Sequence, residues 1–411
     1  MTTPLRQLWQ SPGFAAFLIA RIAILLASQI QTVAVGAQVY ALTHDPLDLG
    51  LIGLSQFLPF LLCVLPAGQM ADRFDRKRIV AACMVLECLC ASVLLALTLH
   101  GLVSPWPMFA VMVPFGIARA VMAPAGQALL PNLVPKALFS RAVGVNSSVW
   151  QMATISGPAI GGMLYARLGP AVAYGTTATL GLLGVVATLL MRAPQQEKTA
   201  RAATLQAVAE GLRFVWQRKA LLGAISLDLF AVLFGGAVAL LPAYATDVLH
   251  VGAEGLGWLR AAPGIGATLL GFWLTARPIR RYAGPAMFGG VFLFGLATIV
   301  FGLSRNFTLS LLMLAVLGAA DMVSVFVRHL LVQLETPDGM RGRVAAVNSM
   351  FISASNELGE FESGITAAWF GLVPAVVIGG LLTLGVVLGC MMLFPVLRTM
   401  DRFPGAVHDD T

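Results

Sequence analysis

The most unusual stretch of the sequence places three glutamates in the middle of an otherwise apolar run. Glu357, Glu360 and Glu362 lie within six residues of one another, in a segment long enough to cross a lipid bilayer. Glu357 and Glu360 share one face of a helix, whereas Glu362 is turned well away from Glu357. Carboxylates this close in a low-dielectric environment cannot all carry charge. We expect at least one to take up and release a proton; cation coordination and pairing with an arginine are the alternatives.

Other charged residues are also expected deep inside apolar runs. Arg119 falls near the centre of the predicted fourth span, where an arginine costs at least about 2.5 kcal/mol to insert. Asp321 occupies the centre of the tenth span, 202 residues later. The deep charges of the first half are mostly arginines, with Glu87 as an exception, and those of the second half are mostly acids. A central cavity with one basic and one acidic wall follows if these side chains face inward. A structural ion pair is the alternative for Arg119.

The composition restricts the class of protein. Hydrophobic residues make up 58% of the chain and charged residues 11%, with a mean hydropathy of +0.85, whereas soluble domains average about 25% charged residues. The apolar runs can cross a hydrocarbon core of about 30 Å, and they lack the two-residue alternation of barrel strands. We therefore expect an all-α membrane protein.

Several other classes are excluded by the sequence. The net charge of +7 does not indicate nucleic-acid binding, because most Lys and Arg residues lie in short loops between the apolar runs. The five cysteines fall inside predicted spans and show no metal-ligand spacing. The chain has no Gly-x-x-x-x-Gly-Lys-Ser/Thr motif and no zinc signature. We expect no cofactor, no metal, no ATP drive from this chain, and no enzyme.

The distribution of basic residues predicts the orientation. With an even number of spans, 20 of the 26 Lys and Arg residues lie in segments on one side of the membrane, and only Arg167 and Arg305 lie on the other. Positively charged loops stay in the cytoplasm, so both termini are expected there. The twelve expected spans are roughly 13–41, 47–70, 78–99, 106–130, 142–167, 171–191, 220–246, 255–276, 285–304, 308–334, 344–369 and 373–397.

One long polar connection divides these spans into two sets of six. It predicts a six-helix domain over 1–192, a linker over 193–219 and a second six-helix domain over 220–411. The linker also carries apolar residues at three- and four-residue steps, which predict an amphipathic helix on the cytoplasmic surface. These residues are Leu205, Val208, Leu212 and Val215.

The two sets of spans repeat in sequence at an offset of 202 residues. The clearest match is the run Arg-x-x-x-Val-Asn-Ser, which begins at Arg141 and again at Arg343. Two like-oriented six-helix halves are the architecture of transporters whose substrate site lies between the halves near the midplane. Glycines coincide at the same offset: Gly116, Gly157, Gly162 and Gly169 recur as Gly318, Gly359, Gly364 and Gly371.

Two further stretches predict contacts between helices. In the loop after the second span, a glycine permits close helix approach, and an acid can pair with arginine or cap a neighbouring helix. We assign a conformational latch to Gly68, Asp72, Arg73, Arg76 and Lys77. The fifth span carries small residues and a proline, which permit close packing and bending. They are Gly144, Gly157, Pro158, Gly161 and Gly162.

Together these stretches resemble the major facilitator superfamily over about residues 13–400. The run from Gly68 to Arg78 is similar to the cytoplasmic signature loop of the superfamily, with Asp75 where most members carry glycine. The fifth span is similar to its antiporter motif, with Ala153 replacing one glycine. The fit looks closest to the bacterial branch that includes the enterobactin exporter and macrolide efflux proteins. The resemblance implies twelve helices in two pseudo-symmetric bundles, alternating access and proton antiport.

The expected function is therefore a proton-coupled exporter of a small amphipathic molecule in a bacterial inner membrane. Coupled import of a small metabolite, driven by protons or sodium, and a non-transport membrane receptor are the alternatives. The expected partners are substrate, protons and membrane lipid, with no nucleic acid, and the chain is expected to be a monomer. We assign proton coupling to Glu357, Glu360, Glu362, Asp321 and Arg119, and lining of the substrate cavity to Arg21, Asp228, Asn356 and Gln151.

Overall fold

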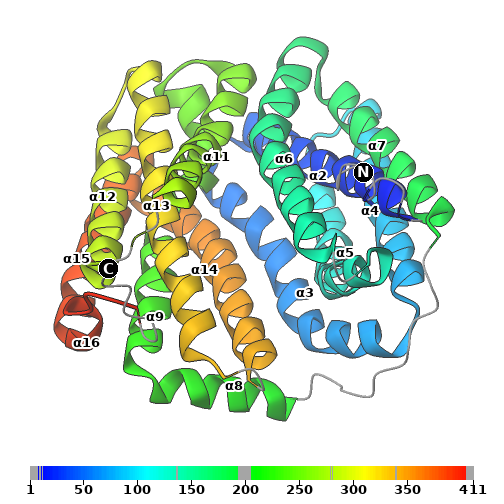
Figure 1. Cartoon of the computed structure of the whole chain (residues 1–411). Coiled ribbons are helices and arrows are strands. Elements are labelled where there is room, and N and C mark those ends of the chain that lie inside the picture. The colour runs from blue at the N-terminus through cyan, green and yellow to red at the C-terminus, as the bar shows by residue number, and fades with distance from the viewer. Residues whose placement is uncertain are drawn as a thin grey trace. The chain divides into compact units, whose positions relative to one another are not determined.

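The computed structural model consists almost entirely of helices (Figure 1). It describes residues 8, 11, 13–135, 138–192, 205–277, 279, 281–337 and 340–403, and it has no strand among them. The predicted all-α class is confirmed. The helices are α2 (Phe14–Thr43), α3 (Pro46–Arg73), α4 (Arg76–Leu99), α5 (Trp106–Leu133), α6 (Phe139–Leu168), α7 (Pro170–Leu190), α8 (Leu205–Gln217), α9 (Lys219–Phe234), α11 (Gly252–Ala276), α12 (Ala283–Leu303), α13 (Phe307–Glu335), α14 (Arg341–Phe370) and α15 (Leu372–Leu393), with short turns η2 (Ala237–Leu240), α10 (Leu241–Ala243), η3 (Tyr244–Val248) and α16 (Pro395–Arg398).

Within the described part of the chain, nine helical stretches are long and apolar enough to cross a membrane. They are α2, the first part of α3, α4, α5, α7, the stretch from Lys219 to Val248, α12, α13 and α15. Three other helices, α6, α11 and α14, are 30, 25 and 30 residues long. The protein is thus a multi-pass membrane protein, and the count of twelve spans stays a prediction.

The helices form two compact units. The N-unit comprises Met1–His44, Leu51–Ala203 and Val251–Ala261, and the C-unit comprises Asp45–Gly50, Thr204–His250 and Ala262–Thr411. Each unit therefore includes the first residues of one helix from the other half of the sequence: α11 in the N-unit and α3 in the C-unit. The domain limits expected from the sequence, 1–192 and 220–411 with the linker between them, stay a prediction.

The predicted seventh span is interrupted soon after its middle. α9 ends at Gly235, and short turns of helix continue from Ala237 to Val248. A β-carbon at Gly235 would collide with the ring of Phe294 on α12, and one at Gly236 would lie 2.9 Å from the carbonyl oxygen of Gly359 on α14. The two glycines thus allow the broken segment to approach both neighbouring helices closely.

The sequence repeat corresponds to a repeated geometry. α6 and α14 end at Gly169 and Gly371, whose φ angles are +84° and +88°; this conformation strains any residue with a β-carbon. A β-carbon at Gly157 of α6 would lie 2.5 Å from Cβ of Gln29 on α2, and the corresponding Gly359 of α14 packs against the backbone of α9. The recurring glycines therefore serve the same helix ends and helix crossings in both halves of the sequence.

Helix α8 lies within the predicted linker and crosses the ends of α9 and α14 (Figure 1). Val215 is buried in the apolar core of the C-unit. A β-carbon at Gly211 would lie 2.8 Å from the carbonyl oxygen of Arg343, and the guanidinium of Arg343 makes an ion pair with Glu210 at 2.5 Å. One face of α8 is therefore packed on the first turn of α14.

Candidate functional site

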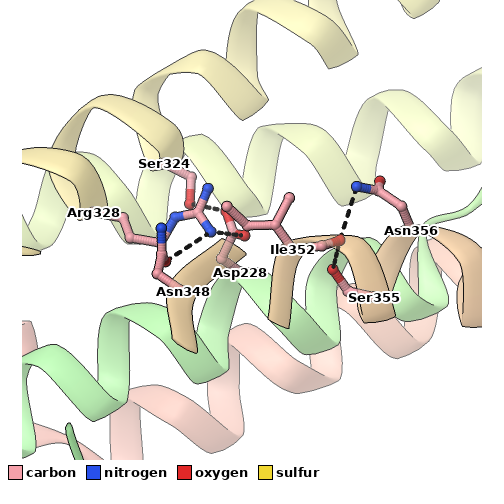
Figure 2. A network of polar contacts seen from close by, with 7 residues as sticks. All are labelled: Asp228, Ser324, Arg328, Asn348, Ile352, Ser355 and Asn356. Atoms are coloured by element: carbon pink, nitrogen blue, oxygen red, sulfur yellow. Dashed lines mark hydrogen bonds and ion pairs between the residues drawn. The ribbon is translucent and has the colours of Figure 1, made fainter. Parts of the chain in front are cut away.

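A buried ion pair lies inside the C-unit (Figure 2). Nη1 of Arg328 on α13 is 2.9 Å from Oδ2 of Asp228 on α9, and the two side chains are 3% and 5% exposed. The hydroxyl of Ser324 donates a hydrogen bond to Oδ1 of Asp228 at 3.1 Å, and Nη1 of Arg328 donates to Oδ1 of Asn348 on α14 at 3.4 Å. The network therefore joins three helices, α9, α13 and α14.

Helix geometry explains why these side chains meet. Ser324 and Arg328 are four residues apart on α13 and so lie on the same face, one turn after the other. Both can then reach one carboxylate on the adjacent α9. A charge buried this deeply is tolerated only when a counter-charge and hydrogen bonds compensate it. Oδ2 of Asp228 faces the counter-charge of Arg328, and Oδ1 accepts the hydrogen bond from Ser324.

Asp321 is a second acid at the same place. It lines a small cavity together with Asp228 and Ser324, and this cavity has room for about one water molecule. The side chain of Asp321 is only partly buried, unlike that of Asp228. It lies within electrostatic reach of both Asp228 and Arg328. Two acids and one arginine therefore share this interior site, and the two acids repel each other if both are ionised.

The three glutamates of α14 lie further along the helix than Asn348. Glu357, Glu360 and Glu362 are all partly buried. Oε1 of Glu362 accepts a hydrogen bond from the hydroxyl of Thr366 at 2.8 Å, within the same helix. The backbone of the broken α9 packs on Gly359, which lies between Glu357 and Glu360. Breaks of this kind in transporters mark sites where substrates and ions bind.

In the N-unit, Arg119 lies beside a glutamine and near a buried acid. Nη1 of Arg119 donates a hydrogen bond to Oε1 of Gln56 on α3 at 3.3 Å, and the side chain of Arg119 is exposed. Glu87 of α4 is 4% exposed and lies within electrostatic reach of both Arg119 and Arg21. Glu87 is not among the site residues expected from the sequence. An acid at the centre of an apolar span was the signal that could have singled it out.

The residues assigned to the substrate cavity lie in different environments. Asp228 is buried in the ion pair, while Arg21 and Gln151 are partly buried. Asn356 is exposed, and its side-chain amide donates to the carbonyl oxygen of Ile352 at 2.9 Å within α14 (Figure 2). Their shared lining of one cavity stays a prediction.

Two residues of the predicted latch, Arg76 and Lys77, make hydrogen bonds among the described residues. The burial and contacts of Gly68, Asp72 and Arg73 lie outside what the structure describes. Nη1 of Arg76 donates to the carbonyl oxygen of Ala128 in the last turns of α5 at 2.9 Å, and Nζ of Lys77 donates to that of Leu189 at the end of α7 at 2.8 Å. Cations are stabilised at helix C-termini, where carbonyl groups lack partners. These two bonds tie the start of α4 to two neighbouring helices of the N-unit.

The small residues of the predicted fifth span lie on α6 and pack against two neighbouring helices. Gly157 and Gly161 contact α2, and a β-carbon at Gly161 would lie 3.0 Å from Cα of Ile30. Gly162 faces the first turns of α11 instead, where a β-carbon would lie 2.5 Å from the carbonyl oxygen of Ala253. Gly144 has open space around it.

Because Gly162 is tightly packed and Gly144 is not, we expect opposite outcomes when each is replaced by alanine. Gly162→Ala should push α11 away from α6 and abolish the transport expected from the sequence, because the new methyl group meets backbone that cannot rotate aside. Gly144→Ala is the matched control, and alanine improves the helix propensity by about 1 kcal/mol, so it should leave transport unchanged. Uptake by vesicles containing equal amounts of each variant measures the effect. Full transport by Gly162→Ala would show that this contact is dispensable.

Comparison with known proteins identifies the family. The model of the Transmembrane secretion effector family, a branch of the major facilitator superfamily, matches residues 2–409. The chain belongs to this family. Members of the superfamily are transporters, so the expectation of a transport protein and not an enzyme is confirmed, as is the resemblance to the superfamily.

Individual relatives of this family are also similar to the chain. The multidrug efflux pump Tap of Mycobacterium tuberculosis is 28% identical over 382 residues, which cover 87% of this chain and 88% of Tap. The enterobactin exporter EntS of Escherichia coli O157:H7 is 26% identical over 408 residues, covering 96% of this chain and 95% of EntS.

Solved structures of transporters share the fold. A variant of the nucleoside transporter NupG superposes with a TM-score of 0.75 at 14% identity, covering 93% of this chain and 99% of NupG. A bacterial homologue of the lysosomal transporter Spinster, inward-facing and unoccupied, gives 0.70 at 15% identity, covering 94% of this chain and 95% of the homologue. At such identities the likeness concerns the fold alone.

Proposed function

We propose that the protein is a proton-coupled exporter of small amphipathic molecules in a bacterial inner membrane, with both termini in the cytoplasm. It works by alternating access, in which a cavity opens to one side of the membrane and then to the other. Membership of the Transmembrane secretion effector family supports a membrane carrier. Export is supported by the names of two relatives, one an efflux pump and the other an exporter.

The observation that carries the coupling proposal is the pair of acids around one arginine in the C-unit. Arg328 and Ser324 already hold Asp228. Asp321 lies beside this pair, but Arg328 is already engaged with Asp228. A proton on Asp321 therefore removes the repulsion between the two carboxylates. Asp321 is the more exposed of the two acids and is therefore the one proposed to exchange the proton. A movement of Arg328 from Asp228 toward Asp321 would expel this proton.

The glutamates of α14 extend the proposed proton route. α14 joins the network through Asn348, about 2.5 turns before Glu357. Protons are proposed to pass between Glu357, Glu360 and Asp321 while the substrate leaves. Arg119 retains its proposed role of tuning these acids, and the loop of Asp72 and its basic neighbours retains its proposed role as latch.

Transport by the purified protein tests this function. A thermal-shift screen against siderophores, antibiotics and metal ions selects a probe, with ethidium as the first amphipathic candidate. In inside-out vesicles with an acidic interior, the wild type should accumulate the probe and a protonophore should stop accumulation. Glu357→Gln and Glu360→Gln should fold normally and accumulate the probe no better than vesicles without protein.

Three outcomes would count against the proposal. Accumulation under the opposite pH gradient would indicate import. Accumulation that follows a sodium gradient and not a pH gradient would indicate a different coupling ion. Unchanged pH-driven transport in Glu357→Gln, Glu360→Gln and Asp321→Asn alike would remove the proposed mechanism.

A further inference from the structure

The N-unit contains a carboxyl group that the proposed proton route does not use. Glu87, on α4, is 4% exposed, and its Oε1 atom is buried without a hydrogen-bond partner among the residues that the structure describes. Among the described residues, none makes an ion pair with it within 4.0 Å; the nearby charges of Arg21 and Arg119 act on it from a longer distance. An ionised carboxylate in such a place would lack both the hydrogen bonds and the close counter-charge that stabilise buried charges elsewhere.

Other polar atoms around Glu87 are also unsatisfied. Nε of Arg21 and both side-chain polar atoms of Gln31, all from α2, are buried without hydrogen-bond partners in the described part of the chain. Gln31 lines the same narrow crevice as Glu87, together with Thr177 of α7. Buried polar groups are nearly always paired, so unsatisfied atoms that gather at one place in a native structure need a specific explanation.

The crevice itself limits what can occupy it. It leaves no room for an ordered water molecule, and therefore none for a metal ion with its coordination shell. Its remaining walls are largely apolar and come from α2, α5 and α7, including Ile24, Phe115 and Gly181. A proton bonded directly to a carboxyl oxygen needs no additional space. It also turns Glu87 into a hydrogen-bond donor, for which Oε1 of Gln31 is an available type of acceptor.

We propose that Glu87 is a second proton-binding site, built into the N-unit and separate from the acids of the C-unit. In the conformation described here Glu87 carries the proton. The proton leaves when a rearrangement of α2 or α5 brings Arg21 or Arg119 against the carboxylate. The consequence for transport, a second proton moved in each cycle, rests on the proposed function; proton binding by Glu87 does not.

The charges that face Glu87 come from two of the helices packed around it. α2 contributes Arg21 and α5 contributes Arg119. α4 itself contributes the thiols of Cys83 and Cys90, which are neutral near neutral pH. It also contributes the thiol of Cys88, which lines the crevice and donates a hydrogen bond to the carbonyl oxygen of Ala178 at 3.4 Å. The described lining from α7 is uncharged. The two arginines are therefore the groups whose movement can change the proton occupancy of Glu87.

Infrared spectroscopy of the full chain in lipid nanodiscs tests this proposal without any substrate. A protonated carboxyl has a C=O stretch distinct from that of a carboxylate. At neutral pH, the wild type should show a component of this band that Glu87→Gln lacks. Glu254→Gln is the matched control, because Glu254 is an exposed glutamate of the same unit that makes an ion pair with Arg167 at 3.1 Å. It should leave the band unchanged.

A second readout uses stability. Glutamine has nearly the shape of a protonated glutamate, so Glu87→Gln should leave the thermal unfolding midpoint unchanged. If Glu87 is instead ionised, glutamine would leave two arginines without their acid, and the midpoint should fall. Should that variant fail to fold, Glu87→Asp keeps a carboxyl and should shift the band component without abolishing it.

The arginines provide a further check. Arg119→Gln removes a positive charge that favours the ionised form, so the band component should persist to more alkaline pH, whereas Arg119→Lys should behave like the wild type. Equal spectra for the wild type and Glu87→Gln at every pH would overturn the proposal. Loss of the component on addition of sodium at constant pH would also overturn it, in favour of a cation site.

Discussion

Replacing Arg328 with glutamine is expected to lower the free energy of unfolding by about 3–5 kcal/mol, because it leaves a buried carboxylate without its counter-charge. Asp228→Asn should cost a similar amount, since it leaves the guanidinium of Arg328 unpaired. The double variant should be more stable than the sum of the two losses predicts. Chemical denaturation in detergent, followed by tryptophan fluorescence, measures all three values.

An exposed pair provides the comparison. Arg167 and Glu254 make an ion pair at 3.1 Å, but their side chains are 64% and 44% exposed. Exposed pairs contribute about 0.2–1 kcal/mol, so Glu254→Gln should hardly change stability. If Arg328→Gln lowered the free energy of unfolding as little as Glu254→Gln, the ion pair of Asp228 and Arg328 would not make the expected contribution to the stability of the C-unit.

Asp321→Asn is expected to leave the protein folded and to abolish substrate-driven proton movement. Among the described residues, no ion pair depends on Asp321, and the amide removes the repulsion from Asp228 permanently. The variant should still let the probe equilibrate down its own gradient but should no longer accumulate it. A pH-sensitive dye inside proteoliposomes, read together with probe uptake, separates the two processes.

Ser324→Ala is the matched control for this experiment. It removes the hydrogen bond to Asp228 from the same helix face but changes no charge. Proton movement in this variant should remain close to that of the wild type. Normal proton movement in Asp321→Asn would exclude this acid as a coupling residue, whatever the behaviour of the α14 glutamates.

Most of the long helices were predictable from the sequence because they depend on a long local pattern of apolar residues, which does not require knowledge of their neighbours. The partners of charged residues were not predictable in this way. The buried ion pair of Asp228 with Arg328, for instance, was not expected from the sequence. The partner of Asp228 depends on which faces of α9 and α13 meet. A local sequence pattern does not predict such a contact between residues 100 positions apart.

The role of Asp75 shows that a local rule can explain a departure from a family pattern. This residue occupies a position where most members of the superfamily carry glycine. In the structure it caps the start of α4, and its Oδ1 accepts the backbone N–H of Arg78 at 2.9 Å. Aspartate is a preferred N-cap residue, so this role could have been predicted from its position just before the third span.

The polarity of α14 has a consequence for how the protein is made. Each charged side chain at the centre of a lone helix adds about 2.5–3.5 kcal/mol to the free energy of insertion by the translocon, and this helix carries three glutamates within six residues. α14 is therefore not expected to leave the translocon for lipid alone. It is expected to enter the membrane together with earlier helices. One of these is α9, where the backbone of Leu233 packs against Gly359. Biogenesis would then bring this glutamate-rich helix into the bilayer only when its protein surroundings are in place.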